Sequence, residues 1–536
     1  MIPEWAKGAV FYQIFPDRFC NGDPSNNIKT GEYSYEPGGE VCFCDNWYEL
    51  PQSTDVHRFY GGDIAGIWEK LPYLKSLGVD AILLNPIFAS PSNHKYDTTD
   101  YDSVDPHLAG GASGLTPNEY FAKFVEAVHE AGMRIVLDGV FNHCGSENAW
   151  LHDLGRHDYF SYKEDGSPEF WWDMTTLPKL NYDGCKALWD EIIRIGRKWV
   201  SPPYNCDGWR LDVAADLGHS EAVNHAFWRR FYDEVKAANP QALIFAEHYG
   251  DASDWLNANE WDTVMNYDGF MDPVSWFFTG VDKHCDNADY ERIGDAAGFT
   301  DALLKMRERF PADSYLCAIN QLDNHDHARY ITRTKCELGR LASAGPDAAG
   351  EGTNFDILRQ SVIFQMTWPG APTLYYGDET AIPGWTDPDN RRTYPWGHEN
   401  FELIDFYKRA ILMHKSSKAL RVGDVKVLYI EGGLFAFERF WQDERVIVVI
   451  NRDDFERDIA IPILKDTAQT DEQSAAGTAV NAATRATRAT RATRVFMTSR
   501  DFPLGYNAGS LEIPVSDGEL PLACPALSSV VIKLHN

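Results

Sequence analysis

The stretch CDGWRLDVA, residues Cys206–Ala214, predicts a short buried strand around which the rest of the chain is organised. Trp209 and Leu211 alternate with Arg210 and Asp212, as expected for a strand whose side chains point in turn to opposite faces. An arginine beside an aspartate favours the ionised carboxylate, and a rigidly held, ionised carboxylate is what nucleophilic catalysis by an aspartate requires. Taken alone, the pair is equally well interpreted as a structural ion pair at a strand end.

Apolar strand-like segments alternate with helical segments on both sides of this stretch. We expect eight strands, at Ala9–Pro16, Val79–Ile87, Met133–Val140, Cys206–Ala214, Ala242–Tyr249, Asp262–Tyr267, Leu316–Leu322 and Pro372–Tyr376. We expect the intervening helices at Ile64–Leu77, Pro117–Ala131, Lys186–Val200, Ala222–Ala238, Ile293–Arg309, Phe355–Met366 and Phe401–Ser417. Apolar strands separated by helices indicate a parallel sheet covered on both faces, and eight such units form a closed (β/α)₈ TIM barrel. An open doubly wound sheet is the alternative, but no GxGxxG motif follows the first strand.

The barrel pattern is interrupted once and ends before the chain does. Between the third strand and the next helix, Cys144–Asp183 is long, irregular and rich in Trp, His, Gly and Pro, which is typical of an inserted subdomain. We therefore divide the chain into an α/β barrel at residues 1–140 and 185–418, an inserted domain at 141–184 and a C-terminal all-β sandwich domain at 419–536. Within the last domain, residues 466–494 are polar and of low complexity, with ATR repeated four times from Ala483 to Arg494, which predicts a solvated loop between two strands.

The charge and the cysteines limit the partners and the compartment that we expect. With 49 basic and 80 acidic residues, the chain has a formal charge of −31, which argues against nucleic acids and anionic membranes as partners. No apolar run of 18 residues predicts a membrane span. The ten cysteines form no CxxC pair for zinc, and no signal segment follows Met1, so we expect a cytoplasmic protein unless a signal peptide has been removed. An aromatic content of 13% weakly favours a carbohydrate ligand.

Acidic and basic residues follow the predicted strands at their carboxyl ends, which is where barrel enzymes have their catalytic residues. The third strand ends in Asp138, the fourth in Arg210 and Asp212, the fifth in Glu247, and the seventh in Asn324, His325 and Asp326. Carboxyl groups crowded into one mouth shift one another's pKa values, so one can stay protonated as a general acid while another is an ionised nucleophile. Two such carboxyls can cleave a glycosidic bond. Ion pairing at the barrel mouth is the structural alternative.

Several motifs carry a specific resemblance. DGVFNH (Asp138–His143), GWRLDVA (Gly208–Ala214), AEHY (Ala246–Tyr249) and LDNHD (Leu322–Asp326) resemble the four ordered sequence regions of the α-amylase superfamily, glycoside hydrolase family 13. HKYDTTDY (His94–Tyr101) is also similar to that family, and LPKLN (Leu177–Asn181) is similar to its neopullulanase, cyclomaltodextrinase and maltogenic amylase branch. The resemblance covers essentially the whole chain. It implies a barrel with a domain B inserted after the third strand and a C-terminal β-domain.

The resemblance implies a retaining, double-displacement mechanism and a role for each matching residue. Asp212 would be the nucleophile, Glu247 the general acid/base, and Asp326 would bind sugar hydroxyls and favour the distorted ring of the transition state. The implied substrate-binding residues are Arg210, which orients Asp212, His143 and His325, which bond to the same glucose unit, Tyr96, which stacks beneath it, and Asp387 and Arg391, which hold the next glucose outward. His248 and Tyr249 differ from the Ile-Trp pair that usually follows the acid in this branch, but the aromatic ring of Tyr249 is still expected to stack under the leaving sugar.

The resemblance also implies a calcium site in the loop after the first strand. Its residues would be Asn21, Asp23, Asn26, Asn27, Gly61 and Asp63, with the glycine contributing its carbonyl oxygen. Asn27 stands where relatives usually have an aspartate, so one charge is missing and weaker affinity is expected. From the residues alone, the segment is better interpreted as a series of plain turns.

The implied activity is cleavage of α-1,4 bonds in maltooligosaccharides, cyclodextrins or pullulan, and cleavage of α-1,6 bonds is left open by the sequence. An α-glucosidase or α-glucosyl transferase of the same superfamily is the alternative. A non-catalytic sugar-binding relative is a remote one, because such relatives lose the acids that this chain keeps. The branch usually has an N-terminal β-sandwich that covers the active site of a dimer partner, whereas this chain starts at the barrel, so the sequence is compatible with a monomer and with a homodimer.

Overall fold

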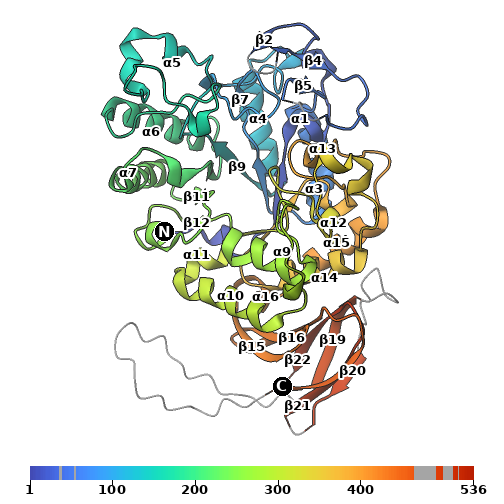
Figure 1. Ribbon diagram of the computed structural model, residues 1–536. Helices are drawn as coiled ribbons and strands as arrows, with labels where there is room; N and C mark the ends of the chain where they lie inside the picture. Colours follow the sequence, from blue (N-terminus) through green and yellow to red (C-terminus); the bar gives the residue numbers. More distant parts are fainter. Residues whose placement is uncertain (36–38, 53–55, 464–490, 499–510, 517, 536) are drawn as a thin grey trace.

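Eight parallel strands form the barrel that the sequence predicts (Figure 1). The computed structural model describes residues 1–35, 39–52, 56–463, 491–498, 511–516 and 518–535. The barrel strands are β1 Phe11–Ile14, β6 Ala81–Leu84, β9 Arg134–Gly139, β10 Gly208–Leu211, β11 Leu243–Ala246, β12 Thr263–Val264, β13 Ile319–Gln321 and β14 Ala371–Tyr375, in the order β12-β11-β10-β9-β6-β1-β14-β13. A parallel bridge between Met265 and Ile319 joins the two ends of this sheet, which confirms the closed arrangement.

Helices surround the strands as the sequence pattern predicts. The longer ones are α2 Ile64–Glu69, α3 Leu71–Leu77, α4 Pro117–Glu130, α6 Lys186–Val200, α7 Glu221–Ala238, α9 Asp272–Thr279, α10 Ala296–Arg309, α14 Phe355–Thr367 and α15 Phe401–Lys415. The prediction of one helix over Ile64–Leu77 was wrong, because the helix divides at Lys70. Pro72 lies in the first turn of α3 and has no N–H to donate to the preceding turn.

Shorter elements connect these units. The short helices are α1 Pro16–Phe19, α5 Ala149–His152, α8 Ser253–Asn257, α11 Ala312–Leu316, α12 Tyr330–Arg333, α13 Leu341–Ala344 and α16 Lys418–Val422. The short strands are β2 Ser34–Tyr35, β3 Gly39–Glu40, β4 Cys42–Phe43, β5 Arg58–Phe59, β7 Phe88–Ala89 and β8 Asp100–Val104. The short strands β2, β4, β5 and β7 lie in the upper part of the molecule, on the side that also carries the insertion (Figure 1).

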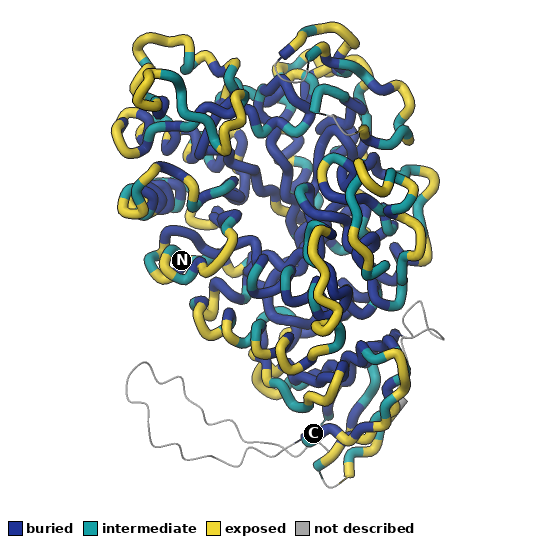
Figure 2. Tube along the Cα trace, in the orientation of Figure 1, coloured by how far each residue is buried: buried dark blue, intermediate teal, exposed yellow. Residues whose placement is uncertain are grey.

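Successive side chains of β10 point alternately to the core between strands and helices and to the barrel interior. Trp209 and Leu211 belong to the large apolar core between strands and helices, and the Trp209 indole donates to Gly196 O on α6 at 3.0 Å. Phe11, Leu83 and other residues of the opposite parity form a second cluster that fills the barrel interior. Arg210 has this inward parity and is 1% exposed. Figure 2 shows the resulting buried centre. The chemistry therefore sits inside the ring of strands.

The inserted segment between β9 and α6 is held by a few backbone bridges rather than by long strands. His143 pairs with Lys179, and Phe160 pairs with Leu180, so the LPKLN motif lies against the end of β9. The segment contains α5 and 3-10 turns at Leu154–Tyr159 and Trp171–Asp173. It stands above the barrel mouth at the upper left of Figure 1.

The C-terminal region is all β. A six-stranded antiparallel sheet contains β15 Asp424–Glu431, β16 Leu434–Trp441, β17 Glu444–Asn451, β22 Ser528–His535, β19 Arg491–Thr498 and β20 Leu511–Pro514, and a second sheet pairs β18 Arg457–Pro462 with β21 Glu519–Cys524. The predicted loop at 466–494 was wrong in its last residues, because Arg491–Arg494 pair with β22 and Ala492 is buried. The rest of that prediction, up to residue 490, lies outside the described residues.

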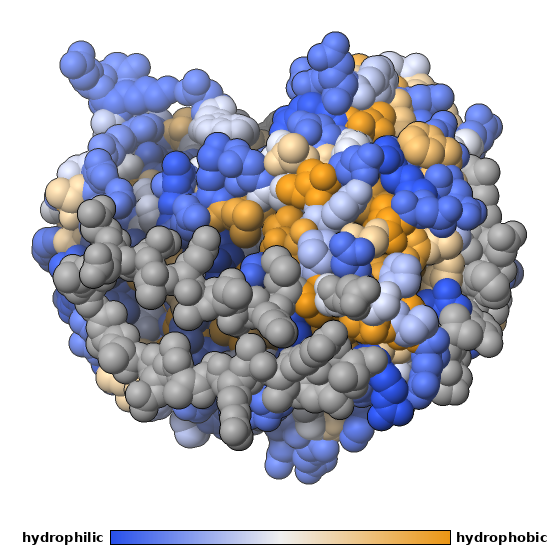
Figure 3. Space-filling view, turned by 90° about the horizontal axis from the view of Figure 1, so that it is seen from below, coloured by the Kyte–Doolittle hydropathy of each residue, from blue (hydrophilic) through white to orange (hydrophobic). Residues whose placement is uncertain are grey.

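The barrel and the C-terminal sheet share one hydrophobic core. Phe364 of α14 lies 6.0 Å from Phe435 and 6.1 Å from Phe437 of β16, measured between ring centroids. The buried Gln360 side chain on the same helix donates to Asn451 O at 2.6 Å and to Ser528 O at 2.9 Å. Seen from the side of this sheet, hydrophobic residues form patches among hydrophilic ones (Figure 3).

Candidate active site

Arg210 is the centre of the site, because its guanidinium contacts three carboxyl groups. Nη1 donates to Asp138 Oδ1 at 2.8 Å and to Asp212 Oδ1 at 2.7 Å, and Nη2 lies 2.8 Å from Glu247 Oε2. All four residues are almost completely buried. Three carboxyl groups thus share a single positive charge in a buried site.

This sharing changes the expected electrostatics. Burial raises the pKa of Asp212 well above its ordinary value, and the nearby Glu247 and Asp138 add to the rise, although Arg210 opposes it. Burial likewise raises the pKa of Asp138 to about 6, against the opposing effect of Arg210. Arg210 lowers the pKa of Asp212, as the sequence predicts, but burial and the two neighbouring carboxyl groups act in the opposite direction. The guanidinium is divided among three partners, so it offsets the burial of each carboxyl group only in part.

The backbone turn after β10 fixes Asp212 and Glu247 relative to each other. β10 ends at Leu211, so Asp212 is the first residue beyond the strand. Val213 follows with φ 36°, a left-handed conformation that a β-branched residue rarely adopts. Its N–H donates to Glu247 Oε2 at 3.1 Å. Backbone strain of this kind is typical of functional sites, and here it holds two carboxyl groups in one arrangement.

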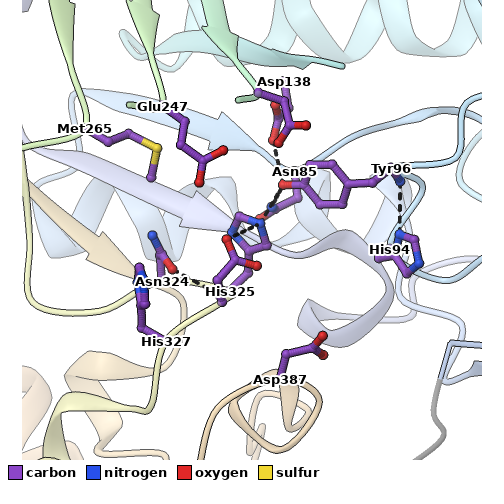
Figure 4. A network of polar contacts seen from close by, with 12 residues as sticks. Asn85, His94, Tyr96, Asp138, Glu247, Met265, Asn324, His325, His327 and Asp387 are labelled. Carbon is purple, nitrogen blue, oxygen red and sulfur yellow. Dashed lines mark hydrogen bonds and ion pairs between the residues drawn. The ribbon is translucent and has the colours of Figure 1, made fainter. Parts of the chain in front are cut away.

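Tyr96, His325 and their neighbours form a continuous hydrogen-bond network on the other side of Asp138 (Figure 4). The Tyr96 hydroxyl donates to Asp138 Oδ2 at 2.8 Å and accepts from Asn85 Nδ2 at 2.8 Å. It also lies 2.7 Å from His325 Nε2, and the two rings stack at 5.2 Å between centroids. Because the hydroxyl proton is given to Asp138, His325 Nε2 must carry the proton of this contact.

His325 is neutral in this network. Gln13 Nε2 lies 3.1 Å from Nδ1, which therefore accepts, in agreement with a proton on Nε2. Burial lowers the pKa of His325 well below its ordinary value, and the charges of Arg210 and Arg391 lower it further. A neutral imidazole avoids placing a second cation beside Arg210.

Asp326 lies at the open edge of the same network. Its side chain is 36% exposed, Oδ2 lies 3.3 Å from His325 Nε2, and Oδ1 lies 3.5 Å from Arg391 Nη2. Arg391 also pairs with Asp387 Oδ1 at 2.8 Å. The structure thus brings Asp326, Asp387 and Arg391 together at the rim, in contact with the buried group through His325.

His143 and Tyr249 lie on two other sides of the pocket. His143 is buried, and burial lowers the pKa of its imidazole to about 4, so it is neutral near pH 7. Its ring stacks on Trp171 at 5.1 Å between centroids. The Tyr249 ring is 48% exposed and stacks on Tyr267 at 4.6 Å. An exposed aromatic face at the rim is available to a ligand.

Sequence reasoning missed several residues of the pocket. Tyr267 lies 3.3 Å from Glu247 Oε1 through its hydroxyl, which also accepts from Asn324 Nδ2 at 3.0 Å. Met265 places its sulfur 3.4 Å from Arg210 Nε. Gln13 and Asn85 complete the set. Gln13 is a polar residue within the apolar run of β1, and Asn85 follows the apolar run of β6, so polarity at a strand end was a signal that could have identified both.

The predicted calcium residues come from the loop after β1 and from the turn before α2, and the Asp23 carboxylate accepts from the N–H groups of Ser25 and Ala112. Asp63 caps α2 and accepts from four donors, namely the N–H groups of Gly22, Asp23 and Gly66 and the amide of Asn26. Asn21 Nδ2 donates to Asn27 Oδ1 at 3.0 Å, and a Cβ placed on Gly61 would come within 2.6 Å of both side chains. No donor among the described residues reaches the buried oxygens Asn21 Oδ1 and Asn26 Oδ1.

Comparison with known families decides which family this site represents. The family model for the catalytic domain of α-amylase matches residues 13–418, which include Asp212, Glu247 and Asp326. The chain belongs to the α-amylase family. The resemblance stated from the motifs is thereby confirmed.

Relatives of this α-amylase family chain include amylopullulanase from Thermoanaerobacter thermohydrosulfuricus, which is 35% identical over 84% of this chain and 33% of its own length. The chain thus spans about a third of the length of the amylopullulanase it matches. Neopullulanase 2 from Thermoactinomyces vulgaris is 36% identical over 84% of this chain and 70% of its own. The debranching enzyme from Nostoc punctiforme has a similar solved structure, with a TM-score of 0.73, 30% identity and coverage of 100% and 99% of the two chains.

One structural finding bears on membrane association. Within the described ranges, no helix of this α-amylase family chain has both the length and the apolar character needed to cross a bilayer.

Proposed function

We propose that the chain hydrolyses α-glucosidic bonds of α-glucans by a retaining mechanism. The observation that carries this proposal is the contact of Asp212 and Glu247 with the two terminal nitrogens of one guanidinium, at 2.7 and 2.8 Å. Two carboxyls held by one arginine favour the short separation of retaining enzymes, about 5–5.5 Å, over the wider spacing of inverting ones. The polar rim and exposed aromatic ring nearby suit a sugar.

In the proposed reaction, Asp212 and Glu247 each act once in the formation of the glycosyl ester and once in its hydrolysis. Asp212 attacks the anomeric carbon while Glu247 gives its proton to the glycosidic oxygen, so the bond to the leaving sugar breaks and a glycosyl ester forms. Glu247, now ionised, takes a proton from water, which attacks the same carbon and releases Asp212. As the charge on Asp212 is lost in the first step, Arg210 still has Asp138 as an anionic partner.

The remaining residues position the sugar. Asp326 is open to solvent, unlike the three carboxyl groups that contact Arg210, so it can accept hydrogen bonds from sugar hydroxyls as a chain enters. His325 and His143 are neutral and therefore donate or accept without adding charge beside the developing oxocarbenium ion. Tyr96 stacks against His325 and against His94, at 5.2 and 5.9 Å between ring centroids, so it forms a fixed aromatic wall beside the sugar. Arg391 and Asp387 extend the contact outward at the rim.

A product profile tests this proposal and its substrate range. Purified protein is incubated with maltotriose, pullulan and β-cyclodextrin, and the products are separated with and without added glucose. We expect cleavage of α-1,4 bonds in maltotriose with release of the α-anomer, and we expect β-cyclodextrin or pullulan to be cleaved as well. Longer products with added glucose would favour the glucosyl transferase alternative. A folded protein that cleaves none of the three substrates would contradict the proposal.

We also propose a structural calcium ion in the loop after β1. The fit rests on the buried oxygens of Asn21 and Asn26 that no donor reaches among the described residues, since amide oxygens are hard ligands of the kind calcium prefers. Asn21, Asn26, Asn27 and the carbonyl of Gly61 would hold the ion. The Asp63 carboxylate already accepts four hydrogen bonds, so it would hold the loop in place rather than bind the ion. A bound ion would link the loop to the turn before α2.

Thermal unfolding tests the calcium proposal. With mostly neutral ligands the affinity should be modest, so we expect millimolar calcium to raise the melting temperature by a few degrees and EDTA to reverse this. Asn21→Ala should remove the response to calcium. Equal melting curves of the unaltered protein with calcium and with EDTA would contradict the proposal.

A reducing compartment suits the cysteines, and we propose a cytoplasmic location on this basis. Most of the thiols are buried, and burial raises the pKa of Cys285 to about 12. Buried thiols behave as small apolar groups. Fractionation of the native host, with the protein detected by an antibody, tests this location, and recovery from the culture medium would contradict it.

A further inference from the structure

Trp172 in the inserted segment is exposed in a way that packing does not explain. Its side chain is 78% exposed, whereas most large aromatic residues of the described chain are buried. Trp172 and the following Asp173 both have left-handed backbone conformations, with φ 50° and 57°. Two consecutive non-glycine residues in this region cost free energy that the rest of the fold must offset. An exposed tryptophan held at such a cost indicates a contact surface.

Trp172 is the outer member of an aromatic stack that begins in the active site. Its ring lies 4.8 Å from Trp171 with an angle of 17°, and Trp171 lies 5.1 Å from His143 with an angle of 18°. Both faces of Trp171 are thus covered. The outward face of Trp172 is the one left for a ligand.

Trp171 is hydrogen-bonded to the turn that follows Asp212, the proposed nucleophile. Its indole N–H donates to Asp216 Oδ2 at 3.0 Å, and Asp216 ends the 3-10 turn Ala214–Asp216. The first N–H of this region, that of Val213, donates to Glu247. Because the general acid must lie beside the oxygen of the leaving sugar, this turn borders the leaving-group side of the bond.

We propose that Trp172 is a binding platform for a glucose unit of the substrate beyond the leaving sugar, with Trp171 as its positioning residue. This inference rests on the proposed function and adds a preference for α-glucan chains long enough to reach the inserted segment. Glucose presents apolar C–H groups on its faces, which pack on an aromatic ring while its hydroxyls stay in water. A flat, pre-positioned ring binds such a unit with little loss of side-chain freedom.

Substrate length is the variable that tests the platform. We expect Trp172→Ala to lower kcat/KM for maltoheptaose about tenfold, which corresponds to about 1.4 kcal/mol, and to change kcat/KM for maltotriose less than about threefold. Trp172→Phe should restore part of the loss because it keeps an aromatic face. The matched control is Tyr290→Ala, since Tyr290 is 54% exposed but lies on the 3-10 turn Tyr290–Arg292 outside the inserted segment.

A binding measurement separates the platform from general damage. In an Asp212→Asn background, we expect Trp172→Ala to raise the Kd for maltoheptaose, measured by calorimetry, about tenfold at an unchanged melting temperature. Equal losses on maltotriose and maltoheptaose, or no loss on either, would overturn the platform while leaving the hydrolase proposal intact. If the unaltered protein neither binds nor cleaves both sugars, the proposed function and the platform fail together.

Discussion

At the residue scale, the site depends on one arginine that serves three acids. Arg210 contacts Asp138, Asp212 and Glu247, so a change to any of them alters the charge felt by the other two. Interacting carboxyl groups of this kind titrate as a group rather than singly. We therefore predict different effects for the replacement of Asp212 and of Asp138.

Asp212→Asn should abolish turnover without unfolding the protein. The amide keeps the size of the side chain but cannot form the glycosyl ester, so we expect kcat to fall by at least about ten-thousandfold. Steady-state hydrolysis and thermal melting are the two measurements. Asp190→Asn is the control, because Asp190 pairs with Arg230 on the surface and should leave kcat unchanged. Near-normal activity of Asp212→Asn would refute the assignment of the nucleophile.

Asp138→Asn should move the acidic limb of the pH profile of kcat/KM to lower pH by about one unit. The limb reports ionisation of the nucleophile, and the negative charge of Asp138 is one cause of the raised pKa of Asp212. Removing that charge lowers the pKa of Asp212, so activity should persist at lower pH even if its maximum falls. Asp102→Asn is the control, since Asp102 pairs with Arg194 outside the pocket. An acidic limb that stays in place or moves to higher pH would contradict the interpretation that Asp138 raises the pKa of Asp212.

At the element scale, the first turn of α2 holds the loop after β1. Asp63 is 0% exposed and accepts from four donors, three of them backbone N–H groups from both sides of the loop. Asp63 thus caps α2 and, through the same carboxylate, fixes the conformation of the loop after β1. With 6 residues, α2 has little stability as an isolated helix, so it depends on this junction and on packing.

Asp63→Ala should destabilise the protein more than loss of an ordinary cap. We expect about 2–4 kcal/mol, because the variant loses the cap and leaves buried donors without an acceptor. The control is Thr116→Ala, which removes the solvent-exposed cap of α4 and should cost about 1 kcal/mol. Urea unfolding in EDTA measures both values without a contribution from calcium. Equal effects of the two variants would show that Asp63 does not act as a junction.

At the scale of the whole molecule, the barrel and the C-terminal sheet are one folding unit. Phe364 is 0% exposed and lies among rings from both parts, including Phe299 at 5.1 Å and Phe435 at 6.0 Å between centroids. Arg439 of β16 is buried and donates to Thr367 O at the end of α14. A shared core of this kind leaves little reason for the two parts to unfold separately.

Calorimetry should therefore show a single unfolding transition, and Phe364→Ala should lower its midpoint while keeping it single. We expect a cost of about 3–5 kcal/mol for the cavity left by the ring. Phe455→Ala is the control, because Phe455 is 52% exposed and should change stability by less than about 0.5 kcal/mol. Two separated transitions in the unaltered protein would contradict the shared core.

The sequence by itself determined the barrel, the order of its elements and the placing of the acids at strand ends. Strand and helix periodicities are local, and a barrel brings all carboxyl ends of its strands to one mouth, so Asp212, Glu247 and Asp326 could be assigned to one pocket. Only the tertiary structure decided that Arg210 is shared, that Tyr267 and Gln13 belong to the site, and that Trp171 and Trp172 stack outward from His143. Those facts depend on contacts between residues far apart in the sequence, and on burial, which changes pKa values in ways that no spacing records.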